Sequence, residues 1–101
     1  MTLGELIAEL KKCDASKVVA HGFAKPHSYR GYYEDLAFEP MENVNVASML
    51  EAAESALGKT FEGYKGGDYT MNEYTACWLS KYGESSGGAI SRAALNCWLN
   101  H

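Results

Sequence analysis

The stretch KPHSYRGYYEDLAFEP, from Lys25 to Pro40, decides the fold of this chain. It places a proline and a glycine between two runs of strand-favouring residues, and this pattern predicts a β-hairpin. The first strand is expected over residues 17–23 and the turn over residues 24–31, because Pro26 cannot donate to a central strand. The second strand is expected over residues 32–39, and the proline that closes the stretch is expected to end it.

An amphipathic helix is expected on each side of this hairpin. Thr2 and Glu5 have the spacing of a capping box, which predicts a helix over residues 3–12. Asn45 is a favourable N-cap for the second helix, and Gly58 stands where a left-handed residue would end it. The apolar stripe of the second helix is Val46, Met49, Leu50, Ala53 and Leu57. Leu6, Leu50 and Leu57 are predicted core residues.

The rest of the chain predicts shorter elements. Residues 68–71 and 75–82 have strand composition, and the glycine- and serine-rich run GESSGG is expected to be a flexible turn. Residues 89–99 fit both a helical stripe and an alternating strand; a helix is favoured because Ser85 or Ser86 could cap it. The order of elements predicts one α+β domain over residues 1–101, with a small, mostly antiparallel sheet and two or three helices.

Composition excludes several classes of protein. The 101 residues suffice for one domain, and nine basic against thirteen acidic residues leave a formal charge of −4. That balance argues against a binder of long nucleic acids, which needs clustered cations. No apolar run approaches the roughly 20 residues of a membrane span. Cys13, Cys77 and Cys97 form no CxxC pair, so we expect buried, reduced thiols in a cytoplasmic protein.

The hairpin carries the first candidate binding surface. Its candidate ligand-binding residues are His27, Tyr29, Arg30 and Tyr32. The planar fork of Arg30 suits phosphate, and Gly31 would allow a ligand to approach the backbone or allow a positive φ. In the alternative interpretation the tyrosines pack on the core and Arg30 pairs with Glu34 or Asp35. Both interpretations remain open.

The second candidate surface is GYKGGDY, residues 63–69. It repeats tyrosines around a cation and glycines, and its candidate residues are Tyr64, Lys65 and Tyr69. Backbone amides next to glycines can bind an anion, although the spacing is not that of a P-loop. The alternative is a plain loop. If both surfaces bind ligand, we expect Arg30 and Lys65 to converge on one pocket.

Catalytic and metal-binding patterns are weak. His21, His27 and His101 lack metal-ligand spacing, and the GxSxG pattern is missing. Glu34 and Asp35 are adjacent on a strand and face opposite ways, so acid–base catalysis by this pair is not expected. We therefore expect a non-enzymatic protein without metal or cofactor.

Several stretches resemble a family of small bacteriophage-encoded proteins. The most specific are SYRGYYEDLAFEP (residues 28–40) and GYKGGDYTMNEYT (residues 63–75), followed by WLSKYGESSG (residues 78–87). Residues 2–10, HGF at residues 21–23 and VASMLEAAESALG at residues 46–58 are also similar. The resemblance carries over no catalytic residue. It implies a phage protein in the host bacterial cytoplasm, where small accessory proteins counter host defence.

Two functions are therefore expected, in order of preference. The first is sequestration of a small phosphate-bearing ligand, such as a nucleotide signal of the host. The second is a protein-interaction module whose tyrosine-rich face blocks a host protein, since tyrosine and arginine are typical of interface hot spots. An aromatic content of 12% predicts exposed rings and a homo-oligomer, most simply a dimer.

Overall fold

Three helices and six strands form the part of the chain that the computed structural model describes, residues 1–63 and 66–100. In chain order they are α1 (Leu3–Lys11), β1 (Val18–Tyr29), β2 (Tyr32–Asn45), α2 (Val46–Ala56), β3 (Thr60–Glu62), β4 (Asp68–Thr70), β5 (Cys77–Leu79), β6 (Gly88–Ala89) and α3 (Arg92–Leu99). One sheet has the order β1-β2-β5-β6, with β2 and β5 parallel and the other pairs antiparallel. Strands β3 and β4 form a separate antiparallel pair. The expected α+β fold is confirmed.

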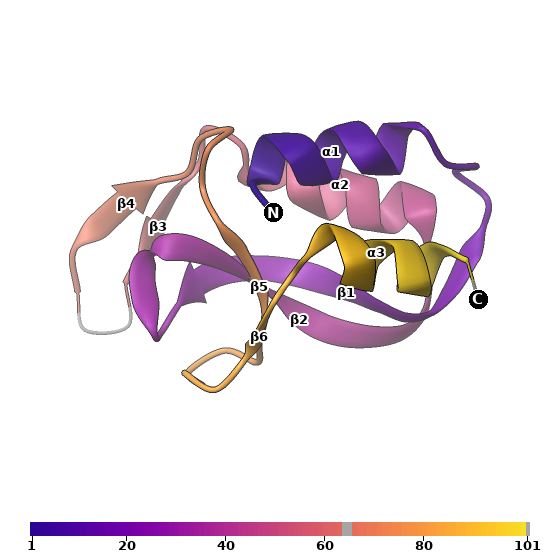
Figure 1. Ribbon diagram of the computed structural model, residues 1–101. Helices are drawn as coiled ribbons and strands as arrows, with labels where there is room; N and C mark the ends of the chain where they lie inside the picture. The colour runs from indigo at the N-terminus through magenta and orange to yellow at the C-terminus, as the bar shows by residue number, and fades with distance from the viewer. Residues whose placement is uncertain (64–65, 101) are drawn as a thin grey trace.

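The long hairpin of β1 and β2 separates two sides of the molecule. Figure 1 shows α1 and α2 side by side along one side of this hairpin, with α3 close to β1. The pair β3–β4 extends from one end of the hairpin, and the connection between β5 and β6 lies on the side away from α1 and α2. In the part of the chain that the structure describes, α1 and α2 therefore cover one side of the hairpin and the β5–β6 connection lies on the other.

Strand β1 is longer than expected and runs through Pro26. The register with β2 shifts between Ala24 and Pro26, and Lys25 between them has a φ of 44°, which marks a bulge. β1 is also an edge strand, where a missing N–H does not interrupt a central ladder. The expected turn over residues 24–31 is thus wrong, because only Arg30 and Gly31 separate the two strands.

Strand β2 likewise continues through Pro40, which pairs with Phe23 of β1. The prediction that this proline ends the strand is wrong. The proline is tolerated because β5, the neighbour of β2 on its other side, is too short to reach Pro40. β5 pairs with β2 only from Leu36 to Phe38, so at Pro40 the strand has a neighbour on one side alone. β2 then extends to Asn45, where α2 begins.

The helix starts follow the local signals. The Thr2 hydroxyl accepts a hydrogen bond from the Glu5 N–H at 3.2 Å, and the Glu5 carboxylate accepts one from the Thr2 N–H at 2.9 Å. The capping box is therefore confirmed. The Asn45 side chain accepts from the Ser48 N–H at 2.8 Å, as expected of an N-cap. The last segment is a helix, but its cap is Ser91 rather than the two serines considered from the sequence.

The apolar stripe of α2 was predicted only in part. Its buried residues are Val46, Met49, Ala53 and Ala56. Leu50 is half-buried against the core, whereas Leu57 follows the last helical residue and is 46% exposed, so its assignment to the core is wrong. Gly58 has the expected positive φ, 78°.

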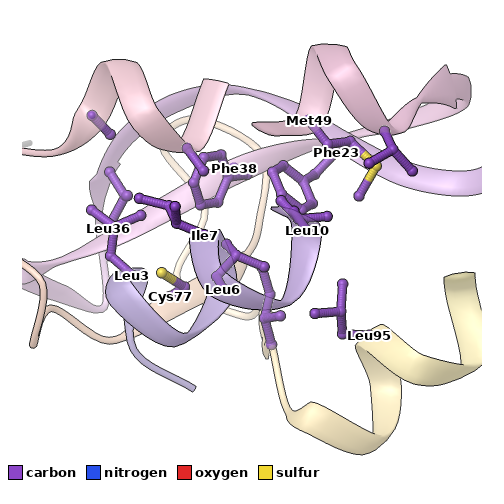
Figure 2. Packing of buried hydrophobic residues seen from close by; sticks show 14 of the residues in the cluster. Leu3, Leu6, Ile7, Leu10, Phe23, Leu36, Phe38, Met49, Cys77 and Leu95 are labelled. Atoms are coloured by element: carbon purple, nitrogen blue, oxygen red, sulfur yellow. The ribbon is translucent and has the colours of Figure 1, made fainter. Parts of the chain in front are cut away.

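The core lies between the helices and the hairpin. Leu3, Leu6, Ile7 and Leu10 of α1 point toward Phe23 and Phe38, with Met49, Cys77 and Leu95 around them (Figure 2). The rings of Phe23 and Phe38 have centroids 4.4 Å apart. Leu6 is fully buried, as predicted. Two cysteines differ from expectation, since Cys97 is exposed and Cys13 is half-buried.

The short strands were the least predictable elements. β5 occupies only the middle of the strand predicted over residues 75–82, and β6 lies at the end of the expected turn. β3 was not predicted, because three residues are too few to show a period. In the described residues, no helix has the length and apolar character needed to cross a membrane.

Candidate functional site

Three of the hairpin side chains that were predicted to bind a ligand, His27, Tyr29 and Arg30, contact the connection between β5 and β6. We call this connection, residues 80–87, the strap. The contacts with strap carbonyl oxygens are His27 Nε2 to Ser80 at 2.9 Å, Tyr29 Oη to Ser85 at 2.8 Å and Arg30 Nη1 to Gly83 at 2.7 Å. Glu39 of β2 adds a fourth contact, because its carboxylate accepts a hydrogen bond from the Tyr82 N–H at 2.6 Å. The dense polar motif thus binds the chain's own backbone.

An aromatic stack lies where the hairpin meets β5. Tyr29 and Trp78 have ring centroids 4.6 Å apart and planes 17° apart, and Tyr29 is only 3% exposed. The Trp78 indole N–H donates to Asp35 Oδ2 at 2.9 Å, so Asp35 bonds to β5. The pairing of Arg30 with Glu34 or Asp35 stays a prediction, and the other part of that interpretation, tyrosine packed on the protein, holds for Tyr29.

Two glycines make these close contacts possible. A Cβ on Gly31 would lie 2.8 Å from Cε2 of Tyr29, so the glycine leaves room for the tyrosine ring to fold across the turn. Its φ is not positive, and the group that approaches its backbone is Tyr29. A Cβ on Gly87 would lie 2.5 Å from the carbonyl oxygen of Leu79. Because glycine has no Cβ, the end of the strap can pack closely against β5.

The remaining predicted residues have different environments. Tyr32 is at the hairpin turn and is 67% exposed. Tyr69 lies in β4 and packs partly against the core. Tyr64 and Lys65 lie outside the described residues, so the predicted convergence of Lys65 with Arg30 stays a prediction.

The two tyrosine-rich stretches nevertheless meet at one concave surface. A pocket of about 450 Å³ lies between the start of β2 and the segment from β4 to β5. It is lined by Glu34, Asp35, Asp68, Tyr69, Thr70, Asn72, Tyr74, Thr75 and Ala76. The first two residues belong to the hairpin stretch and most of the others to the second stretch or its continuation. We call this concavity the acidic pocket.

One wall of the acidic pocket is a hydrogen-bonded turn. The Asn72 side chain accepts from the Tyr74 N–H at 2.8 Å, and the Asn72 N–H donates to the Thr75 hydroxyl at 2.9 Å. Tyr74 lies within this turn and is 78% exposed. It therefore lines the pocket from an exposed position.

The acidic pocket is lined mainly by acidic, aromatic and small polar residues. The described residues that line it include the three carboxylates Glu34, Asp35 and Asp68 and two phenol rings, and none of them is a lysine or an arginine. In the described part of the chain, no group of three or more His, Cys, Asp or Glu side chains could hold a metal ion. The pocket thus combines negative charge with aromatic faces, which both attract ammonium and guanidinium groups.

A second, more apolar hollow of about 360 Å³ lies on the opposite part of the hairpin. Its lining is His21, Gly22, Pro40, Met41, Glu42, Leu79 and Trp98. Cys77, the first residue of β5, is buried in the core, and burial raises the pKa of its thiol to about 12, with a further contribution from the nearby Asp35 carboxylate. A thiol in this environment does not supply a nucleophile at neutral pH.

The comparisons with protein-family models, with curated proteins and with solved structures gave no match. The site is therefore defined by its own geometry. Sequence reasoning missed the roles of Asp68, Tyr74 and Trp78, and it missed the strap as the partner of the hairpin. The hairpin and the strap both belong to stretches that resemble phage proteins. This shared resemblance does not predict that the two segments contact each other.

Proposed function

We propose that this protein is a non-enzymatic binding protein that takes a basic side chain of a partner protein into the acidic pocket. The pocket itself carries the proposal, because three acidic residues and two tyrosines are among the residues that line one concavity of about 450 Å³. A guanidinium or ammonium group would gain charge-assisted hydrogen bonds from the carboxylates and a cation–π contact from a ring.

The surroundings of the pocket support a protein as the partner. Tyr74 at the rim is largely exposed, and Tyr32, also exposed, stands two residues before Glu34 on β2. Residues two apart on a strand share a face, so Tyr32 extends the tyrosine surface beyond the pocket. Exposed tyrosines beside a charged recess are typical of the anchoring residues in protein interfaces.

The phosphate-bearing ligand expected from the sequence receives less support. Carboxylates repel phosphate, and the Arg30 guanidinium already donates to the Gly83 carbonyl. A phosphate site would need cations that the described lining of the acidic pocket does not supply. If the protein is encoded by a phage, as the resemblance implies, the partner is a basic surface of a host protein in the bacterial cytoplasm. Binding of that host protein would then counter host defence.

The test is an NMR titration of the ¹⁵N-labelled protein with capped tripeptides that carry arginine, lysine or glutamate at the centre, and with AMP. The arginine and lysine peptides are expected to shift the amides of Asp68, Tyr74 and Glu34, and the glutamate peptide is not. The double variant Glu34→Gln with Asp68→Asn is expected to abolish these shifts. The matched control, Glu51→Gln together with Glu54→Gln on α2, removes the same charge and is expected to keep them.

Two outcomes would overturn the proposal. Equal shifts in the wild type and the Glu34/Asp68 variant would mean that the peptides bind elsewhere. Shifts with AMP at Arg30 and none with the cationic peptides would favour the phosphate-bearing ligand instead.

A further inference from the structure

Strand β2 loses one of its two neighbours partway along its length. β5 pairs with β2 only from Leu36 to Phe38, whereas β2 runs on to Asn45. In the part of the chain that the structure describes, no other strand pairs with residues 39–45 on the β5 side. Residues 40–43 are all exposed. The stretch 39–43 is therefore an open strand edge, and we call it the β2 edge.

The hydrogen bonds to β5 show which backbone groups the β2 edge presents. The Leu36 N–H donates to, and the Phe38 carbonyl oxygen accepts from, backbone groups at the two ends of β5. Backbone groups alternate in direction along a strand, so the even-numbered residues of this stretch point toward the β5 side. The β2 edge therefore presents the carbonyl oxygen of Pro40 and both the N–H and the carbonyl oxygen of Glu42.

These three backbone groups are open to a partner. β1 lies on the other side of β2, and among the described residues no hydrogen bond from elsewhere reaches the backbone of Pro40 or Glu42. The row ends at Asn43, whose φ of 52° breaks the extended backbone. A row of unpaired N–H and C=O groups is the template on which an extended peptide adds as a further strand.

The second hollow, of about 360 Å³, lies against the β2 edge. Its lining includes three residues of that edge, Pro40, Met41 and Glu42, together with Leu79 of β5 and Trp98 of α3. Met41 is 42% exposed, so its side chain is available for contact. In strand addition, backbone bonds supply affinity and pockets for alternate side chains supply specificity. The hollow is such a pocket, and its chemistry selects an apolar side chain.

Charge narrows the kind of partner. Among the described residues that line the second hollow, the one carboxylate is that of Glu42, which forms no ion pair with another described residue. A lysine or arginine beside the apolar residue would meet this carboxylate. A second copy of the chain would instead bring a formal charge of −4 to an acidic edge, which disfavours it as the occupant.

We propose that the β2 edge and the second hollow form a further binding site, which takes an extended, basic peptide segment of a partner protein as an added strand. The peptide backbone pairs with Pro40 and Glu42, an apolar side chain enters the hollow, and a cationic side chain pairs with the Glu42 carboxylate. The inference does not depend on the acidic pocket, because the two sites share no lining residue.

The test is an NMR titration of the ¹⁵N-labelled protein with the capped pentapeptide KVLVK. The peptide is expected to shift the Glu42 amide and the Trp98 indole N–H, and to slow hydrogen exchange at the Glu42 amide. Two further versions carry N-methyl groups on alternate residues, one on the first, third and fifth and the other on the second and fourth.

The N-methylated peptides distinguish strand addition from other contacts. An added strand points only alternate N–H groups at its neighbour, so one version is expected to bind about tenfold or more weakly and the other to bind like the parent. Charge and apolar area are nearly the same in all three peptides. Equal affinities for the three, or no shift at Glu42 with the parent peptide, would overturn the proposal.

A matched pair of variants locates the site. Met41→Ser is expected to weaken the binding of KVLVK, whereas Leu57→Ser, at an apolar position that is similarly exposed, is expected to leave it unchanged. Shifts confined to Asp68 and Tyr74 would overturn this inference while leaving the acidic pocket as a binding site. Protection of the Glu42 amide that rises with protein concentration alone would identify a second copy as the occupant and would also overturn it.

Discussion

Tyr29 and Trp78 stack face to face with ring centroids 4.6 Å apart, which joins the turn end of the hairpin to the parallel strand β5. Each ring also has a polar tip with a partner, the Ser85 carbonyl for Tyr29 and the Asp35 carboxylate for Trp78. The pair therefore stabilises the helix-free side of the sheet by apolar contact and by hydrogen bonds at once.

The first prediction separates these two contributions. Tyr29→Phe keeps the ring and removes the hydroxyl, so it is expected to cost about 0.5–1.5 kcal/mol of the free energy of unfolding. Tyr29→Ala also removes the stack and is expected to cost about 3–5 kcal/mol. Urea denaturation measures both. Equal losses in the two variants would mean that the ring contact does not stabilise the fold.

The second prediction concerns the helix faces. Leu6→Ala is expected to lower the free energy of unfolding by about 2–5 kcal/mol, because Leu6 is fully buried in the core. Leu57→Ala, at an exposed position past the end of α2, is expected to stay within about 0.5 kcal/mol of the wild type. The same denaturation experiment compares them, and a large effect at Leu57 would contradict a helix that ends before this residue.

The third prediction concerns the capping box of α1. Thr2→Ala is expected to cost about 0.5–2 kcal/mol, since an N-cap oxygen is lost. The pKa of Glu5 is lowered, first by the hydrogen bond from the Thr2 backbone N–H, then by the Thr2 side chain, and further by Arg92. A carboxyl group with a lowered pKa in the folded state stabilises above its unfolded pKa, and this contribution is lost as the pH falls through the folded pKa.

The difference in stability between the wild type and Glu5→Gln is accordingly expected at neutral pH. It should decline below the unfolded pKa of a glutamate, about 4.3, and disappear once the pH is below the lowered pKa of Glu5 in the folded state. Thermal unfolding at a series of pH values measures it. The control is Glu51→Gln, on an exposed part of α2, and a constant difference for Glu5→Gln across the series would contradict a stabilising role of the Glu5 carboxylate.

The fourth prediction is that the cysteines differ in reactivity. Cys97 is exposed, whereas burial raises the pKa of the Cys77 thiol to about 12. At about pH 8 a maleimide is expected to label Cys97 rapidly and Cys77 only after unfolding, because the thiolate is the reactive form. Peptide mass spectrometry locates the label. Fast labelling of Cys77 in the folded protein would show that β5 opens readily.

The fifth prediction is self-association. Tyr32, Tyr74 and Tyr82 all expose most of their surface, and exposed rings of this kind favour a dimer. Light scattering over a concentration series is expected to give twice the mass of the 11.1 kDa chain. Replacing Tyr74 by serine is expected to weaken the dimer, and a monomer at every concentration would remove this prediction.

The candidate site could be predicted only in part, and the reason lies in its long-range contacts. The sequence identified His27, Tyr29 and Arg30 as side chains that make polar contacts, and each has a hydrogen-bond partner in the structure. Their partners are backbone carbonyl oxygens of the strap, which carry no signal in the sequence because every residue has one. The same residue types serve for a ligand or for the chain itself.

Local signals in the sequence determined the helices and the presence of the hairpin. Capping side chains act within three residues and a helical stripe repeats every few residues, so Thr2, Asn45 and the apolar positions of α1 suffice to predict them. Only the tertiary structure decided how far the strands run. Pro26 and Pro40 are tolerated because one lies on an edge strand and the other beyond the end of β5, and the cost of a missing N–H depends on which neighbour is present. The acidic pocket was likewise decided by the tertiary structure. Glu34 and Asp68 line the same pocket because the β3–β4 pair packs against β2.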